Sequence, residues 1–178
     1  MGIKAAKTSN ARLSARQETA APTEDSYAES LEHKPGEEEK IHIVSFFLGN
    51  AEYALEVTDA VEVLRPREVT EVPRTPEFIR GILSVRGEMV PVMDLKLRLG
   101  IGEAGQRPGR ILIAAVEDIK AGFTVDRLAG VKEVPASSLE PLSGGEQEAD
   151  APFLKGLIRV GDATIRLLNA RRLIEFIL

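Results

Sequence analysis

The chain contains no cysteine and no tryptophan, and its only histidines are His33 and His42. Without cysteine it can form neither a disulfide framework nor a thiolate metal site. Two histidines are too few for a zinc site built from imidazoles. His42 lies inside a run of strand-forming residues, where a single histidine is more often packed than catalytic. We therefore expect a protein that holds no metal or other cofactor.

Long apolar runs and an excess of basic charge are also missing. No apolar run approaches the roughly 18 residues of a membrane-spanning helix, and the N-terminus has no apolar core of a secretory signal. These features predict a cytoplasmic protein without direct membrane insertion. A net charge of −5 and an aromatic content of 4% give no reason to expect nucleic acid as a partner.

Sequence signatures of catalysis are absent as well. The chain has no Gly-x-Ser-x-Gly, P-loop or His-Glu-x-x-His pattern. Residues 100–109 match Gly-x-Gly-x-x-Gly, but they follow a predicted helix and precede a predicted strand, the reverse of a dinucleotide site. We interpret them as a flexible loop and predict that the protein is not an enzyme.

The most informative feature is an internal repeat. Residues 78–100 and 153–174 align without a gap at an offset of 75. The aligned pairs include Phe78 and Phe153, Gly81 and Gly156, Val92 and Leu167, and Asp94 and Asn169. Two copies indicate two halves of one architecture, because a solenoid needs at least three.

Both copies predict the same local structure. A Gly-containing turn leads into an apolar strand, a tight turn and a second strand, in which Leu167 should lie in the core. Asp94 or Asn169 then caps a short helix, since both side chains accept hydrogen bonds from free N–H groups of a first helical turn. Gly100 ends the first helix, and the second is expected to run to the end of the chain.

The remaining pattern predicts a mainly β fold. Strands are expected at 41–48, 52–57, 69–72, 111–116, 121–125 and 131–134, with a short helix at 59–64 and a long acidic loop at 135–152. Each half then contributes about five short strands and a little helix. Short strands with frequent turns favour closed barrels, so we predict two small β-barrels that share apolar surface.

Residues 1–39 differ from the rest of the chain in composition. They contain almost no large apolar residues, which predicts a disordered tail ahead of one folded domain at 40–178. Basic residues precede the acidic ones in this tail, so a basic arm that contacts acidic lipid or a partner is the alternative.

Differences between the two copies identify candidate functional residues. Copy one turns at Arg86-Gly87 and copy two at Gly161-Asp162. A turn has no backbone need for arginine, so Arg86 is either a solvated charge or a donor to a partner. Glu62 either completes a capping box with Asp59 or contacts a partner. Asn169 cannot ionise, which argues that Asp94 is a cap and not half of a carboxylate pair.

Taken together, several segments resemble the CheW family, the adaptor of bacterial chemotaxis. The same domain also forms the last domain of the histidine kinase CheA. The resemblance covers roughly residues 40–178. It rests on the order and spacing of these segments: Phe47-Leu-Gly, Tyr53-Ala-Leu, Glu62-Val, Pro76-Glu-Phe-Ile-Arg-Gly-Ile, Val85-Arg-Gly, Val90-Pro-Val-Met-Asp-Leu, Phe123-Thr-Val-Asp and Gly156 to Leu173.

The resemblance implies two five-stranded, SH3-like β-barrels and a non-enzymatic role in two-component signal transduction. A family member couples methyl-accepting chemoreceptors to the CheA regulatory domain, in cytoplasmic arrays beneath the inner membrane. The residues that it implies as receptor-binding are Glu62, Arg86, Gly87, Ile111 and Val131, and the further partner-binding residue is Gly81.

Two alternative functions remain at this point. One is a CheW-like adaptor of a different chemosensory pathway, such as pilus motility or development. The other is a β-barrel that binds a ligand or nucleic acid, although the sequence offers no basic, aromatic-lined face for it. The long tail and the acidic loop leave the identity of the receptor open.

Overall fold

Strands dominate the computed structural model, which describes residues 38–103, 109–142 and 148–177. The predicted tail therefore lies almost wholly outside the described residues. The strands are β1 Lys40–Leu48, β2 Ala51–Glu56, β3 Ala60–Leu64, β4 Ile79–Val85, β5 Glu88–Asp94, β6 Arg110–Val116, β7 Ile119–Val125, β8 Arg127–Pro135, β9 Leu139–Glu140, β10 Leu154–Val160 and β11 Ala163–Leu168. The helices are α2 Leu95–Leu99 and α3 Ala170–Ile174, with 3-10 turns η2 Ala136–Ser138 and η3 Ala151–Phe153.

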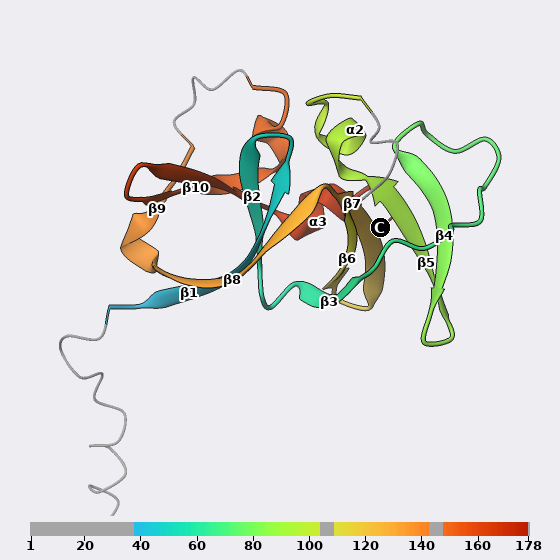
Figure 1. The fold of residues 1–178 in the computed structure, drawn as a ribbon, viewed down its shortest axis with the longest axis horizontal. Coiled ribbons are helices and arrows are strands. Elements are labelled where there is room, and N and C mark those ends of the chain that lie inside the picture. The colour runs from blue at the N-terminus through green and yellow to red at the C-terminus, as the bar shows by residue number, and fades with distance from the viewer. Residues whose placement is uncertain (1–37, 104–108, 143–147, 178) are drawn as a thin grey trace, which may run out of the picture. The chain divides into compact units, whose positions relative to one another are not determined.

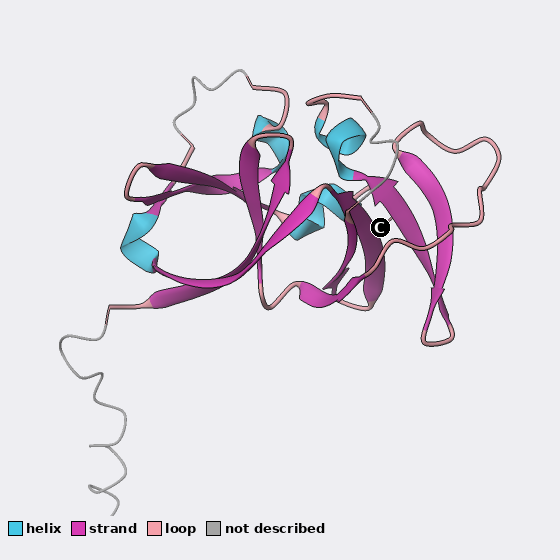
Figure 2. Cartoon of the chain, in the orientation of Figure 1, coloured by secondary structure: helices cyan, strands magenta, loops and turns pink. Residues whose placement is uncertain are grey.

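The strands form two sheets, shown in Figures 1 and 2. Sheet A has the order β8-β1-β2-β11-β10-β9 and sheet B the order β3-β6-β7-β5-β4. The predicted mainly β class is confirmed. Sheet A has six strands where five were expected, because the two-residue β9 pairs with β10. Closure of each sheet into an SH3-like barrel stays a prediction.

The two sequence halves are interleaved between the sheets. The hairpin β1–β2 from the first half lies beside β10–β11 from the second, and β6–β7 lies beside β4–β5. The joins are parallel, β2 with β11 and β5 with β7, whereas the hairpins are antiparallel. Neither sheet is therefore built from one half alone.

The repeated glycines lie where another segment of the chain comes very close to their strand. A Cβ atom at Gly81 would lie 2.3 Å from the backbone oxygen of Thr70, and one at Gly156 would lie 2.6 Å from that of Glu140. Thr70 forms an isolated bridge with Ile82 in β4, and Glu140 belongs to β9 beside β10. In each repeat, another segment thus lies so close to the strand that the glycine of the strand cannot carry a side chain.

Three apolar clusters hold the fold together. The largest is shared by the two sheets and both helices, and includes Phe46, Leu55, Phe123 and Leu173. Each sheet also has a cluster of its own, around Ile158 in sheet A and around Ile113 in sheet B. Leu167 is fully buried in the sheet A cluster, which confirms the prediction that it belongs to the core.

The predicted helix ends are confirmed at three of four places. Asp94 accepts from the backbone N–H groups of Lys96 and Leu97, and Asn169 from that of Arg172. Gly100 ends α2 with a φ of 70°. The expectation for the fourth end was wrong, because α3 stops at Ile174 and the chain continues as a turn.

Three other local predictions are corrected. The predicted helix at 59–64 is strand β3, because its backbone groups pair with β6 and its valines alternate. The predicted strand at 69–72 forms only the Thr70–Ile82 bridge, in a segment bounded by Pro66 and Pro73. The predicted loop at 135–152 contains η2, β9 and, at its end, the start of η3.

Candidate functional site

The turn between β4 and β5 carries Arg86 in an unusual backbone conformation. Arg86 has a φ of 51° and Gly87 a φ of 88°, so both central residues of this two-residue turn lie at positive φ. Such turns favour Gly, Asn or Asp at these positions. The equivalent turn of copy two has Gly161 with a φ of 58° at the position of Arg86. Arginine is therefore a strained choice for this position, and strain of this kind concentrates at functional sites.

The contact between Arg86 and Glu62 joins the two edges of sheet B. Arg86 Nη2 lies 3.3 Å from Glu62 Oε2. Glu62 is in β3 and Arg86 follows β4, and these are the two outermost strands of the sheet. The side chain of Arg86 is 83% exposed and that of Glu62 is 21% exposed. An ion pair with so exposed an arginine contributes little to stability, so the guanidinium is available to a partner.

A hollow lies beside this pair. Its lining combines two ion pairs with apolar side chains: Val61, Glu62, Val85, Arg86, Glu88, Ile113 and Lys120. Lys120 Nζ lies 2.5 Å from Glu88 Oε2. Ile113 is buried, and Val61 is an exposed large apolar residue. Apolar patches with a charged rim are typical of protein–protein contacts.

The other predicted site residues do not line the hollow. Gly87 lies in the Arg86 turn. Val131 is 69% exposed but belongs to β8 of sheet A and does not line the hollow. Ile111 is 1% exposed and packs in the sheet B cluster, so its side chain offers no surface to a partner. Gly81 is buried under Thr70.

Sequence reasoning missed Val61, Glu88 and Lys120 at this site. The alternation of Val61 and Val63 around Glu62 is a strand signal, but the segment was interpreted as a helix because Asp59 and Glu62 match a capping box. Lys120 and Glu88 carry no signal in sequence, since pairing of β5 with β7 brings their strands together.

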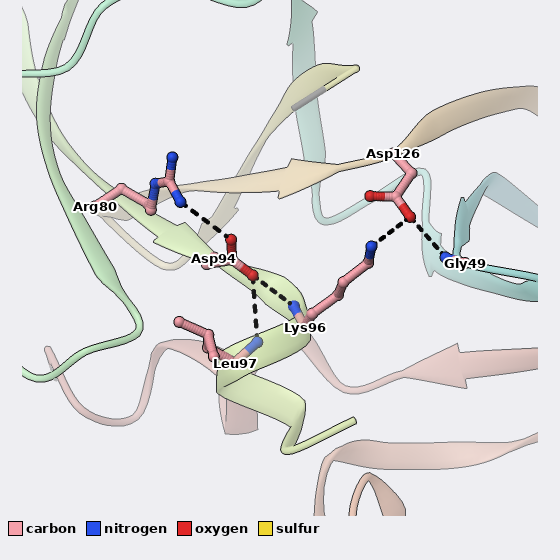
Figure 3. A network of polar contacts seen from close by, with 6 residues as sticks. All are labelled: Gly49, Arg80, Asp94, Lys96, Leu97 and Asp126. Carbon is pink, nitrogen blue, oxygen red and sulfur yellow. Dashed lines mark hydrogen bonds and ion pairs between the residues drawn. The ribbon is translucent and has the colours of Figure 1, made fainter. Parts of the chain in front are cut away.

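A polar network extends from the end of β5 toward sheet A (Figure 3). Buried Asp94 caps α2, and its Oδ2 lies 3.5 Å from Arg80 Nη1. Lys96 in α2 points to Asp126, with 2.7 Å between Nζ and Oδ2. The same Asp126 oxygen accepts from the backbone N–H of Gly49, in the turn between β1 and β2. The carboxylates of this network serve caps and ion pairs.

A second network ties the end of the acidic segment to sheet A. The Tyr53 hydroxyl donates to Asp150 Oδ2 at 2.7 Å, and Arg166 pairs with both Glu148 and Asp150. Burial, the hydrogen bond to Asp150 and its negative charge raise the pKa of Tyr53 well above its ordinary value. Burial also raises the pKa of Asp59, with Glu56 adding to the effect. The hydrogen bond between Tyr53 and Asp150 therefore ties the residues just before η3 to β2 of sheet A.

Within the described ranges, no three His, Cys, Asp or Glu side chains are arranged to hold a metal ion. None of the helices in that part of the chain has the length and apolar character that a membrane crossing requires. A β scaffold with an exposed arginine turn beside a hollow of apolar side chains and ion pairs is typical of a protein-binding domain.

Comparison with known proteins identifies the family. Residues 42–177 match the CheW-like domain, so the chain belongs to the CheW family. Its members are non-enzymatic scaffold adaptors of chemotaxis that couple chemoreceptors to CheA, which confirms the predictions of the family and of a protein without catalytic activity.

Similar proteins support this assignment. The chain is 30% identical to the chemotaxis protein CheW of Helicobacter pylori over 106 residues, which are 59% of this chain and 64% of that protein. It is 34% identical to Protein FrzA of Myxococcus xanthus over 134 residues, covering 73% and 82%. The crystal structure of the scaffolding protein TtCheW from Thermoanaerobacter tengcongensis matches with a TM-score of 0.71 and 36% identity, covering 77% of this chain and 94% of that one.

Proposed function

We propose that the chain couples chemoreceptors to the kinase CheA and binds the receptor through the hollow beside Arg86. One observation carries the proposal: an exposed arginine occupies a positive-φ turn position that the repeat fills with glycine. Family membership supplies the kind of partner, a chemoreceptor tip on one side and a CheA regulatory domain on the other. This role implies a place in receptor arrays beneath the inner membrane.

The chemistry of the hollow fits an acidic, partly apolar helical partner. A guanidinium offers a forked pair of donors to a carboxylate, and the exposed Val61 offers apolar contact. The guanidinium has further N–H donors, so Arg86 binds the partner's carboxylate while keeping its contact with Glu62. Glu62, which is mostly buried, would keep the arginine aimed at the rim.

The other predicted residues take different parts in this proposal. Val131, exposed on β8, serves as a second receptor contact. Ile111 acts by packing beneath the receptor-binding surface, and Gly81 by allowing Thr70 to cover β4. The CheA regulatory domain is assigned to a surface that does not include Arg86.

Titration of purified variants against a receptor hairpin and a CheA regulatory domain tests the proposal. Arg86→Ala should weaken receptor binding by about tenfold or more, since truncating a central arginine commonly costs about 2 kcal/mol. Arg86→Gly should do the same while relieving the positive-φ strain. Arg159→Ala, which removes an exposed and paired arginine from β10, is the matched control and should keep receptor affinity.

The affinities for the receptor hairpin and for the CheA regulatory domain together show which part of the proposal is wrong if it fails. Loss of kinase binding with intact receptor binding would place Arg86 in the other interface. Unchanged affinity for both partners would show that the turn charge is only solvated. Folding should change by less than about 0.5 kcal/mol in Arg86→Ala, as at other exposed sites, so weaker binding cannot be ascribed to unfolding.

An adaptor of a different chemosensory pathway is the second candidate. The similarity to Protein FrzA is higher in identity than that to the Helicobacter pylori CheW and covers more of the chain. Identification of the kinase that copurifies with the protein distinguishes the two pathways.

A further inference from the structure

Helices α2 and α3 occupy equivalent places in the repeat, directly after β5 of sheet B and β11 of sheet A. Arg98 in α2 aligns with Leu173 in α3 at the repeat offset of 75. The two aligned residues meet in space. Arg98 Nε donates to the backbone oxygen of Leu173 at 3.0 Å, and Nη2 donates to that of Arg172 at 3.2 Å. The two copies of the repeat are thus joined to each other at Arg98.

Two aromatic rings flank this contact. The Cζ atom of Arg98 lies 4.9 Å from the ring centroid of Phe78 and 4.9 Å from that of Phe153. Phe78 and Phe153 are themselves equivalent in the repeat. Cation–π contacts strengthen when the cation is desolvated, and Arg98 is partly buried. The guanidinium of Arg98 therefore contacts an equivalent aromatic ring in each copy of the repeat.

Each helix is also linked to a hairpin turn of the opposite sheet. In α2, Lys96 pairs with Asp126, which accepts from Gly49 in the β1–β2 turn of sheet A (Figure 3). In α3, Arg171 pairs with Glu117 in the β6–β7 turn of sheet B. Lys96 and Arg171 are equivalent in the repeat. A continuous series of polar contacts therefore runs from sheet A through α2, Arg98 and α3 to sheet B.

We infer that Arg98 is the joint that fixes the orientation of sheet A relative to sheet B. The shared apolar cluster supplies attraction between the sheets, but that attraction is non-directional. A planar guanidinium with two fixed donors is directional, and here it binds the carbonyls that end α3. Loss of Arg98 leaves each sheet folded and lets the angle between them vary. This inference concerns the chain alone and does not depend on any partner.

Distance measurements between the sheets test the inference. Because the chain has no cysteine, one pair can be introduced at exposed positions, Met89→Cys in sheet B and Val160→Cys in sheet A. Spin labels at these sites report the distribution of inter-sheet distances. Arg98→Met, which keeps an unbranched apolar side chain but loses the donors, should broaden the distribution by about twofold. Arg98→Lys keeps the charge without the fork and should broaden it less; it also carries the test should Arg98→Met fail to fold.

Arg166→Met is the matched control. Arg166 is also partly buried and lies over an aromatic ring, that of Tyr53, but its contacts stay within and beside sheet A. It should lower stability to urea while leaving the width of the distribution unchanged. An unchanged width in both Arg98 variants, or equal broadening in Arg166→Met, would show that apolar packing alone sets the orientation.

Discussion

Replacing Asp94 with asparagine separates its two roles, as a helix cap and as the partner of Arg80. Asparagine caps a helix about as well as aspartate, so the hydrogen bonds to the N–H groups of Lys96 and Leu97 should persist. The interaction with Arg80, 3.5 Å between Nη1 and Oδ2, loses its charge. Asp94 is buried and Arg80 partly so, and an interaction of this kind contributes about 1–2 kcal/mol. We expect Asp94→Asn to lower the free energy of unfolding by that amount.

Urea unfolding followed by circular dichroism measures the effect. The slope with urea for a domain of this size is about 1–3 kcal/mol/M, and at a slope of about 2 kcal/mol/M the midpoint should fall by about 0.5–1 M. Arg80→Met in both backgrounds completes a double-mutant cycle, which isolates the Arg80–Asp94 interaction from the cap.

The second copy of the repeat supplies the control. Asn169 is the equivalent of Asp94, and Lys155, the equivalent of Arg80, is paired with Glu56. Asn169→Asp should therefore change stability by less than about 0.5 kcal/mol, as at an ordinary exposed site. The reasoning fails if Asp94→Asn also costs less than that, or if the Arg80→Met effect is the same with and without the Asp94 carboxylate.

Three further predictions concern the fold. Leu167→Ala should cost about 2–5 kcal/mol in urea unfolding, because it empties a fully buried site; a loss below about 1 kcal/mol would contradict the burial. Gly81→Ala, at a φ of 143° and under Thr70, should cost about 2–4 kcal/mol from strain and overpacking, whereas Gly49→Ala at an open turn should cost less. Because the pKa of Tyr53 is raised in the folded state, its contribution is fully present below its ordinary pKa of 10.0 and is lost as the pH rises above it. Tyr53→Phe should therefore show a shallower loss of stability above that pH, and equal slopes would refute this.

Local chemistry explains the parts of the fold that the sequence predicted. The apolar strand at 41–48, the repeat hairpins and the caps at Asp94 and Asn169 each rest on residues close together in the chain. The same is true of Gly100, whose positive φ ends α2. These features need only neighbouring side chains and backbone groups, so a single sequence suffices to find them.

Contacts distant in sequence account for most of what was missed. The interleaving of the halves depends on the parallel pairing of β2 with β11 and of β5 with β7, which leaves no periodic signal. In 59–64, the capping-box pattern competed with the alternation of Val61 and Val63, and pairing with β6 decided the outcome. At the candidate site, the sequence predicted Glu62 and Arg86, but their contact depends on how the two outermost strands of sheet B approach each other. Lys120 could not be predicted, because it joins the site only through the pairing of β7 with β5.

Positions where the two copies keep the same backbone and differ in side chain are the most informative about asymmetry. The Gly81 and Gly156 pair is retained because the chain crosses both strands closely, and either Asp or Asn satisfies the cap. By contrast, Arg86 and Gly161 both have a positive φ, a conformation that glycine adopts more easily than arginine. The backbone of this turn therefore does not require an arginine side chain. Arg98 likewise replaces an equivalent leucine, and its donors reach the other copy instead of its own. The first difference therefore supports the proposed contact with a partner, and the second supports the proposed joint between the sheets.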